Sequence, residues 1–416
     1  MRCYYTRHRR GGRRFPTVTR KGDWGDLPDN VLLNITGLLP CRADRVRMAC
    51  VNKQWRAAVR PEQRPPPPAP QLPPLPPQLP WLIFPNTTTP CFYSLIGGRS
   101  HALPLPPDII VGRFCGSADG GWFVLALNSR HRYEIYNLNS GSRVELPPGI
   151  ETPLGMQFPL VAVFATLSVS RASRPNMAAA IVRVKRNLDA AFWCPGSECW
   201  FPHRGPRMRK PQDVIFYNEA FYFVTATEGV VVFWPSFGRP TNNQMLMRRV
   251  EYDMLVRADY LEDINFMRGN GVITRYLVES RGGLLMVARY IYDEGGTEAF
   301  RVFRFQIIQP NANDGGRPRA TWVHVDDLDE RMLFLGKGCS RTFEVARFEG
   351  FEEAFVYFLD ESSFCPDKTA MVLHRPRYTF SDMGKFDLDA VTCEDWPPVD
   401  RRPLSSDNAP PTWWLP

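Results

Sequence analysis

Apolar and polar residues follow two different patterns along this chain, and the change between them falls near residue 80. Between residues 24 and 60 the apolar positions recur at helical spacing, as at Val31, Leu32 and Ile35, which predicts an amphipathic helix. From Pro80 onward, short runs rich in β-branched and aromatic residues alternate with Gly, Asp and Asn, which is typical of strands and turns. The pattern therefore predicts a small helical unit followed by a long β region.

Turn and capping residues divide the helical region into three helices. Pro28 suits a first helical position, where its missing N–H costs nothing, and Pro40 ends the first helix. Asp44 is expected to cap the second helix and Asn52 the third. Three helices in so short a segment bury little surface, so we expect this unit to depend on a partner.

The β region contains one hairpin after another. Residues 213–234 predict three strands with turns at Asn218-Glu219 and Glu228-Gly229, and residues 275–292 predict two strands joined at residues 281–283. Gly269-Asn270-Gly271 is expected to form a further hairpin turn. No stretch between the strands has the length and periodicity of a crossover helix, so we expect antiparallel sheets.

A weak internal echo suggests how these strands are grouped. An aromatic strand end, a turn and then a Trp or Leu-Pro recur in YNLNSGSRVELPP from Tyr136, in the segment from Phe303 to Trp322, and in FDLDAVTCEDWPP from Phe386. Repeated strand-turn-strand phrases are typical of a propeller. We therefore predict a mainly β fold, an antiparallel β-propeller preceded by a small three-helix unit, with a pair of β-sandwiches as the alternative; the echoes do not give the number of blades.

The charge of +8 is concentrated at the N-terminus. Residues 1–22 contain eight of the 51 Lys and Arg residues and none of the 43 Asp and Glu residues, so the rest of the chain is formally neutral. A basic tail on a neutral body argues against nucleic acid as the main partner. The tail itself has three readings, which are a nuclear-import signal, an organelle transit peptide and a solvated extension without function.

Composition completes the division of the chain. Residues 61–80 contain eleven of the 40 prolines, which predicts an extended polyproline spacer. The expected segments are a disordered basic tail (1–22), the helical unit (23–60), the proline-rich linker (61–79), the propeller (80–400) and a C-terminal tail (401–416). No apolar run approaches the roughly 20 residues of a membrane span, the N-terminus lacks the apolar core of a secretory signal, and the ten scattered Cys fit a reducing compartment.

Catalytic and metal-binding motifs are hard to find in this sequence. The six His are isolated, and no nucleophile elbow, phosphate-binding loop or dinucleotide fingerprint is present. Cys194, Cys199 and His203 are the best metal candidate, but a fourth ligand is missing, and we favour a structural role. Neighbouring acids such as Asp326 and Asp327 point to opposite faces of a strand and suit solvated loops better than an acid–base pair. We therefore expect no catalytic residue, metal or cofactor.

The helical region resembles an F-box. The resemblance covers residues 24–60 and includes the opening Leu27-Pro28 and the Val51-x3-Trp55 spacing. The sequence departs from the family at Asn52, where Cys is frequent, and at Thr36 and Arg45, where apolar residues are common. These departures are expected to weaken the surface that faces an adaptor.

The β region is similar to the KIB-type β-propeller, a plant family long labelled a domain of unknown function. The similarity extends from the F-box-like segment to about residue 395. It is carried by seven phrases in order, namely PWLIFP (80–85), FCGSADGGWFVL (114–125), YNLNSG with ELPP (136–148), AFWCPGSECW (191–200), DVIFYNEAFYFV (213–224), YLVESRGGLLMVAR (276–289) and RMLFLGKGCS (331–340).

This combination implies a substrate-recognition subunit, without catalysis of its own, of an SCF-type (cullin-RING) E3 ubiquitin ligase. The F-box would bind a Skp-type adaptor, and through it a cullin, while the propeller captures a target protein that the sequence does not identify. The residues expected to face the adaptor are Leu27, Pro28, Leu32, Ile35, Val51 and Trp55. Two alternatives stay open, a propeller interaction module without ligase coupling and a β-propeller hydrolase. The expected location is the nucleus, the cytoplasm or both.

Overall fold

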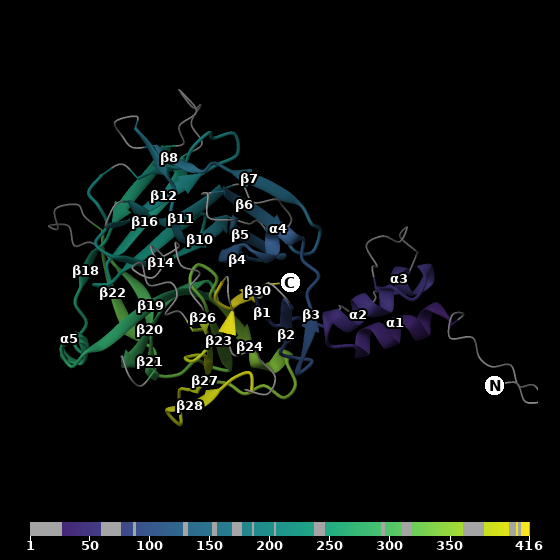
Figure 1. The fold of residues 1–416 in the computed structure, drawn as a ribbon. Coiled ribbons are helices and arrows are strands. Elements are labelled where there is room, and N and C mark those ends of the chain that lie inside the picture. Colours follow the sequence, from purple (N-terminus) through teal and green to yellow (C-terminus); the bar gives the residue numbers. More distant parts are fainter. Residues whose placement is uncertain are drawn as a thin grey trace, which may run out of the picture. The chain divides into compact units, whose positions relative to one another are not determined.

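The computed structural model divides the chain into two compact units, residues 1–76 and 77–416 (Figure 1). The expected basic tail and most of the expected proline-rich linker lie outside the described residues. The structure describes residues 27–59, 76–85, 89–127, 132–151, 156–168, 177–184, 187–203, 205–236, 246–292, 296–309, 318–360, 378–398, 405–406 and 409–415.

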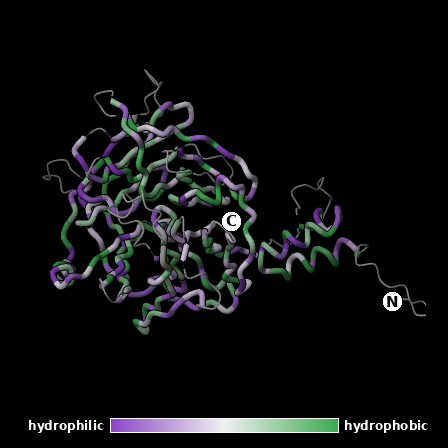
Figure 2. Tube along the Cα trace, in the orientation of Figure 1, coloured by the Kyte–Doolittle hydropathy of each residue, from purple (hydrophilic) through white to green (hydrophobic). Residues whose placement is uncertain are grey.

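The first unit contains the three predicted helices, α1 (Asp29–Leu38), α2 (Arg42–Ala49) and α3 (Lys53–Val59). Asn52 caps α3 as predicted, because its side-chain Oδ1 accepts a hydrogen bond of 2.9 Å from the backbone N–H of Trp55. The predicted cap of α2 was wrong: Cys41 precedes the helix, and Asp44 lies within its first turn. Polar and apolar stretches alternate along these helices (Figure 2), as the sequence pattern requires.

The second unit is a six-bladed antiparallel β-propeller, and the fold class predicted from the sequence is therefore confirmed. The first blade has the order β3-β2-β1-β30 and consists of β1 (Trp81–Phe84), β2 (Cys91–Ser94), β3 (Arg99–Ala102) and β30 (Thr412–Trp414). The second consists of β4 (Arg113–Ala118), β5 (Trp122–Leu127), β6 (Arg132–Asn137) and β7 (Arg143–Leu146). The third consists of β10 (Ala162–Ser168), β11 (Met177–Val184), β12 (Asn187–Trp193) and β13 (Phe201–Pro202).

The remaining three blades follow in chain order. The fourth consists of β14 (Pro211–Tyr217), β15 (Ala220–Thr225), β16 (Val230–Ser236) and β17 (Leu246–Glu251). The fifth has the order β18-β22-β21-β20-β19 and consists of β18 (Asp253–Leu255), β19 (Gly271–Ser280), β20 (Gly283–Tyr292), β21 (Gly296–Ile308) and β22 (Arg319–His324). The sixth has the order β24-β23-β25-β27-β28 and consists of β23 (Arg331–Leu335), β24 (Arg341–Glu344), β25 (Phe355–Phe358), β27 (Gly384–Asp387) and β28 (Thr392–Asp395).

Two short ribbons add to the blades, β8 (Gly149–Glu151) with β9 (Gln157–Pro159), and β26 (Tyr378–Thr379) with β29 (Ser405–Ser406). Not every strand pair is antiparallel, because β18 pairs with β22 and β23 pairs with β25 in parallel. Neither pair is joined by a tight hairpin. Their relative direction is therefore not fixed by the hairpin geometry from which the antiparallel expectation came.

The C-terminal segment belongs to the propeller. Residues 401–416 were expected to form a tail, but Thr412–Trp414 pairs with β1, with Trp81 opposite Trp414. The last strand of the chain therefore completes the blade that the first strands begin. This closure joins the two ends of the propeller, so that the first blade depends on both.

Hydrophobic clusters fill the spaces between neighbouring blades. One cluster combines Ile135 of the second blade with Ala180 of the third, and another combines Phe192 of the third with Phe223 of the fourth. Further clusters join the fourth blade to the fifth, the fifth to the sixth, and the sixth to the first. Both faces of an inner strand are thus covered, which explains why strands such as β10 are buried along their whole length.

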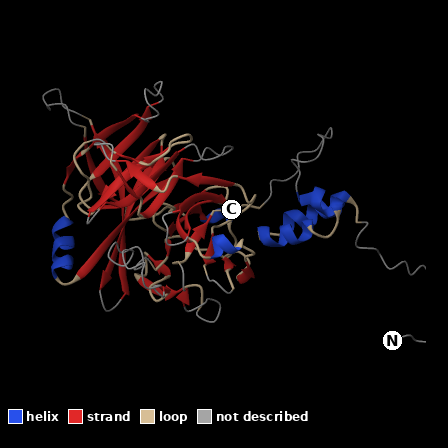
Figure 3. Ribbon diagram, turned by 45° about the horizontal axis from the view of Figure 1, so that its top comes forward, coloured by secondary structure: helices blue, strands red, loops and turns tan. Residues whose placement is uncertain are grey.

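The elements described after Pro76 are mostly strands. They also include the short helix α4 (Pro107–Ile110), the 3-10 helix η4 (Val345–Arg347) and the helix α5 (Tyr260–Arg268), which lies at the edge of the β structure (Figure 3). The sequence did not predict α5. The hairpin turn predicted at Gly269-Asn270-Gly271 was also wrong. Gly269 follows the last residue of α5 and Gly271 begins β19, so these three residues join a helix to a strand. No helix in the described part of the chain has the length and apolar character that crossing a membrane requires.

The internal echo marks equivalent positions in three blades. Tyr136 lies in β6, Phe303 in β21 and Phe386 in β27. Each of these strands pairs with the last strand of its blade in chain order. The repeated phrase therefore forms the outer pair of strands in the second and sixth blades, whereas in the fifth blade β18 lies outside this pair.

Candidate functional site

The helical unit has a small core to which all three helices contribute. Leu32, Met48 and Ala58 come from α1, α2 and α3 and are almost completely buried. Six partly buried side chains pack around them, namely Leu27, Leu33, Ile35, Leu39, Trp55 and Val59. A side-chain amide also fixes the start of α1, because Gln54 Nε2 donates to the carbonyl oxygen of Leu27 at 2.8 Å and to a carboxylate oxygen of Asp29 at 3.0 Å.

The residues expected to face an adaptor divide into three groups. Leu32 is fully buried, so it affects a partner surface only through the fold of the unit. Leu27, Ile35 and Trp55 are half-buried and pack against the core. Pro28 and Val51 are exposed, and Val51 keeps 56% of its surface accessible. The two exposed residues and the outer parts of the half-buried ones remain the predicted contact surface.

Three exposed apolar residues of the unit are not among the residues predicted to face an adaptor. Leu38 is 80% exposed and Val46 is 53% exposed, and Val31 at the start of α1 is also exposed. A signal was present, since Leu38 continues the helical spacing of Val31 and Ile35. A three-helix unit cannot bury every apolar position that helical periodicity provides, so some of them had to remain outside.

Thr36 and Arg45 do not weaken a partner surface, because both are buried inside the unit. The Thr36 hydroxyl donates a hydrogen bond of 2.8 Å to the carbonyl oxygen of Leu32. The Arg45 guanidinium donates to the carbonyl oxygens of Leu39 at 2.8 Å and Pro40 at 3.4 Å, just after the end of α1, and burial lowers its pKa. The expectation for these two departures was therefore wrong, since both side chains satisfy backbone carbonyls within the fold.

At the centre of the propeller, one carboxylate joins three blades. Asp213 in β14 is 1% exposed. Its Oδ1 accepts hydrogen bonds from the N–H groups of Val214 at 2.9 Å and Gly338 at 2.8 Å, and its Oδ2 accepts one from Leu277 at 2.7 Å. Burial raises the pKa of Asp213 to about 7, although Lys337 and the three amide groups oppose the rise.

The turn of residues 336–340 fills the space beside this carboxylate. A Cβ atom on Gly338 would lie 2.6 Å from the carbonyl oxygen of Ala165 in the third blade, and one on Gly336 would lie 2.9 Å from Trp413 in the first. Lys337 Nζ donates to the carbonyl oxygen of Arg275 in the fifth blade at 2.7 Å. A turn of the sixth blade that touches the first, third, fourth and fifth must lie on the propeller axis. Among the described residues the axis is therefore occupied by protein at this level.

A catalytic site of the kind found in propeller hydrolases would need polar groups that face an open channel. Asp213 is a carboxylate that contacts the turn of residues 336–340, and its hydrogen bonds go to backbone N–H groups. The described histidines lie elsewhere: His101 stacks on Phe92, and His324 is exposed and pairs with Asp326. In the part of the chain that the structure describes, no group of three His, Cys, Asp or Glu side chains has the geometry of a metal site.

The metal candidate predicted from the sequence separates into three unrelated contacts. Cys194 Sγ lies 3.1 Å from the hydroxyl of Ser197, Cys199 Sγ donates to Glu151 Oε2 at 3.2 Å, and His203 Nε2 lies 2.7 Å from Asp189 Oδ1. Burial and the bond to Glu151 raise the pKa of Cys199 to about 12, which disfavours the thiolate that a metal would need. The geometry agrees with the structural role that the sequence favoured.

Comparison with known families gives two matches. A family model described as KIB1-4 beta-propeller matches residues 92–387, and a model described as F-box-like matches residues 24–63. The first match covers more than half of the chain. No curated protein matches the chain significantly.

Several solved structures resemble the chain distantly. The N-terminal domain of Nup159 has a TM-score of 0.30 and 11% identity, and the match covers 59% of this chain and 59% of that domain, or about three fifths of its length. AztD from Citrobacter koseri has a TM-score of 0.31 and 11% identity over 80% of this chain and 86% of its own. A gluconolactonase from Xanthomonas campestris has a TM-score of 0.27 and 12% identity over 55% of this chain and 83% of its own. Scores this low carry no argument about function.

Proposed function

Because the chain belongs to the KIB1-4 β-propeller family and carries an F-box-like segment before the propeller, we propose that it is the substrate-recognition subunit of an SCF-type (cullin-RING) ubiquitin ligase. In this proposal the helical unit binds a Skp-type adaptor, which connects it to a cullin, and the propeller holds a target protein. The chain itself performs no chemistry. The proposed site of action is the nucleus, the cytoplasm or both, and the eight cysteines among the described residues, all free thiols, suit such a reducing compartment.

The observation that carries this proposal is the presence of exposed apolar residues on a unit with a very small core. Leu38, Val46 and Val51 expose more than half of their surface although the unit has few apolar residues to spare. Covering them with a partner would add burial that the unit cannot obtain alone. An obligate partner interface buries apolar side chains in this way.

The alternative of a propeller interaction module without ligase coupling differs from the proposal only in that the helical unit binds no adaptor. It loses support because Thr36 and Arg45, two departures from the F-box pattern, serve the interior of the unit. The hydrolase alternative loses support from the occupied axis and from the hydrogen bonds that Asp213 makes to backbone groups. The neutral charge of the chain after residue 22 also favours a protein as the captured molecule over nucleic acid.

Charged substitutions on the exposed apolar surface test the adaptor contact. We expect Leu38→Asp/Val51→Asp to weaken co-purification with a co-expressed Skp-type adaptor by more than about 100-fold in affinity, because each lost apolar contact costs about 1.5 kcal/mol or more. Both positions are exposed, so the helical circular dichroism of the chain should not change.

The matched control is Asn30→Asp/Asn34→Asp, which adds the same charge at two exposed polar positions of α1. We expect this control to keep adaptor binding within about threefold of the unchanged chain, a difference of under about 1 kcal/mol. Equal adaptor binding by Leu38→Asp/Val51→Asp and the unchanged chain would exclude this surface as the contact.

A further inference from the structure

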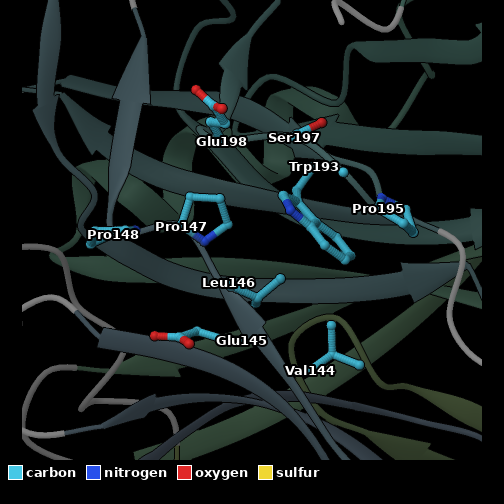
Figure 4. A pocket seen from close by; sticks show the side chains of 10 residues that line it. Val144, Glu145, Leu146, Pro147, Pro148, Trp193, Pro195, Ser197 and Glu198 are labelled. Atoms are coloured by element: carbon cyan, nitrogen blue, oxygen red, sulfur yellow. The ribbon is translucent and has the colours of Figure 1, made fainter.

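A groove opens between the second and third blades, where the end of β7 faces the loop that follows β12 (Figure 4). Its volume is about 410 Å³, which is within the range of ligand-binding pockets. Leu146 and Pro147 line one side, Pro195 lines the other, and Trp193 lies between them (Figure 4). The groove shares no residue with the F-box-like segment or with the residues described at the propeller axis.

The walls of the groove are fixed by hydrogen bonds. The buried Trp200 donates from its indole N–H to the carbonyl oxygen of Pro147 at 3.1 Å, and its backbone N–H donates to Gly149 at 2.9 Å. On the other side, Ser197 N–H donates to the carbonyl oxygen of Cys194 at 3.1 Å, which closes the turn after Trp193. The two walls therefore belong to one hydrogen-bonded arrangement, and a ligand would not have to order them.

The floor of the groove is apolar but offers one unused donor. Trp193 is 3% exposed, and its indole lies between the two walls with the nitrogen on the side of Pro147 (Figure 4). The indole N–H is buried and has no hydrogen-bond partner among the described residues. Buried Trp N–H groups usually have an acceptor. The indole N–H of Trp193 therefore lacks, among the described residues, the acceptor that such a group usually has.

The rim of the groove is acidic. Glu145 on β7 and Glu198 on the opposite loop are both exposed, and neither forms an ion pair within the described residues. No Lys or Arg lines the groove. An apolar floor between two free carboxylates is complementary to an apolar side chain that has cationic neighbours.

We propose that this groove binds an extended peptide segment of the target protein in which an apolar side chain is flanked by Lys or Arg. The apolar side chain packs on Trp193, between Pro147 and Pro195, and the flanking cations pair with Glu145 and Glu198. The inference depends on the proposed function only for the statement that the peptide belongs to a ubiquitination target. The peptide-binding chemistry stands on the groove itself.

The test uses the full chain and a fluorescein-labelled peptide of sequence Gly-Lys-Ser-Lys-Leu-Lys-Ser-Lys-Gly, followed by fluorescence anisotropy. We expect saturable binding that weakens at least tenfold in Glu145→Lys/Glu198→Lys and at least fivefold when Ser replaces the central Leu of the peptide. The matched control is Glu349→Lys/Glu353→Lys, which makes the same charge change at exposed positions of the sixth blade and should alter the affinity less than twofold. Both double variants change exposed residues, and equal melting temperatures will show that they fold.

Three results would overturn the proposal. The first is equal weakening in the two double variants, which would indicate only nonspecific charge attraction. The second is binding that becomes at least tenfold tighter when residues 2–21 are deleted, which would make the chain's own basic segment the occupant. The third is a dimer in sedimentation that Glu145→Lys/Glu198→Lys dissociates, which would make the occupant a second copy.

Adaptor co-purification of the same variants separates this inference from the proposed function. Intact adaptor binding without peptide binding would refute the groove proposal alone. Peptide binding without adaptor binding would refute the ligase proposal alone.

Discussion

Asp213 shows how much of the propeller depends on a single side chain. Its two oxygens accept hydrogen bonds from three backbone N–H groups in three blades, and it is buried. The sequence offers Asp213 only as the first residue of a predicted hairpin, and hairpin signals describe neighbours in the chain. Its partners Leu277 and Gly338 are far away in sequence, so no local pattern could have revealed this junction.

The pH dependence of stability tests the Asp213 junction. Because its pKa is about 7 in the fold, above the ordinary value of 3.8, the folded chain keeps a proton between about pH 4 and 7 that the unfolded chain has lost. The contribution of Asp213 to stability is therefore largest below pH 4 and falls as the pH rises toward 7. We expect Asp213→Asn to be destabilised by about 1–3 kcal/mol, because one amide donor loses its acceptor, with a deficit that is larger at pH 5 than at pH 8. Thermal melts of the variant and the unchanged chain at pH 5 and pH 8 measure this deficit in stability.

The exposed Asp389→Asn is the control for this experiment, since Asp389 forms no ion pair among the described residues. Its melting temperature should follow that of the unchanged chain at both pH values. A deficit of Asp213→Asn that grows from pH 5 to pH 8 would contradict the assigned protonation.

Gly338 allows close packing to be separated from backbone strain. Gly338 and Gly141 have nearly the same positive φ, 72° and 71°, but a Cβ on Gly338 meets the Ala165 carbonyl oxygen and one on Gly141 meets nothing within 4 Å. We expect Gly141→Ala to cost about 1 kcal/mol for the backbone conformation alone. Gly338→Ala should cost at least about 2 kcal/mol more, because the axis must open to admit the methyl group. Equal melting temperatures for the two variants would show that the axis is not closely packed.

At the scale of elements, local sequence signals predicted several hairpin turns correctly but failed at Gly269-Asn270-Gly271, which joins a helix to a strand. The predicted turns at Asn218-Glu219, Glu228-Gly229 and Arg281-Gly282 all join adjacent strands, and each contains residues with positive φ. Their chemistry is contained in two or three residues, which is why the pattern could show it.

The helix α5 illustrates why other elements were missed. It is held by tertiary contacts: Asp263 is fully buried and accepts a hydrogen bond of 2.6 Å from the Tyr290 hydroxyl, and it also pairs with Arg257. A nine-residue helix of mixed composition is marginal by itself, so its sequence carries little helical signal. The exposed residues Leu38 and Val46 were missed for a related reason, because periodicity identifies apolar positions without saying which of them the small core will cover.

The closing strand β30 makes the clearest prediction at this scale. Trp413 is fully buried in the cluster between the first and sixth blades, and its indole N–H donates to the carbonyl oxygen of Leu335 at 2.7 Å. We expect Trp413→Ala to destabilise the propeller by about 3–5 kcal/mol, the usual cost of removing a large buried aromatic side chain. Leu261→Ala, at a 69% exposed position of α5, should change stability by less than about 0.5 kcal/mol. Urea unfolding, followed by tryptophan fluorescence and circular dichroism, compares the stabilities of the two variants. Similar stabilities would mean that closure by β30 contributes little to the stability of the propeller.

At the scale of the whole molecule, the chain combines an F-box-like unit with exposed apolar residues and a propeller whose axis is filled where the structure describes it. The charge of +8 belongs to residues 1–22, and the rest of the chain, which includes the apolar surface and the groove, is formally neutral. Family membership and fold could be predicted from the sequence because they are carried by many phrases in order. The groove could not, because its two walls come from different blades and meet only in the folded chain.

The most direct test of this account is the binding isotherm of a purified Skp-type adaptor titrated into the full chain. We predict saturable one-to-one binding that persists when residues 2–21 are deleted and is lost in Leu38→Asp/Val51→Asp. Absence of binding to the full chain, or equal affinity for the chain with both substitutions, would contradict the proposal that this protein couples its propeller to a ubiquitin ligase.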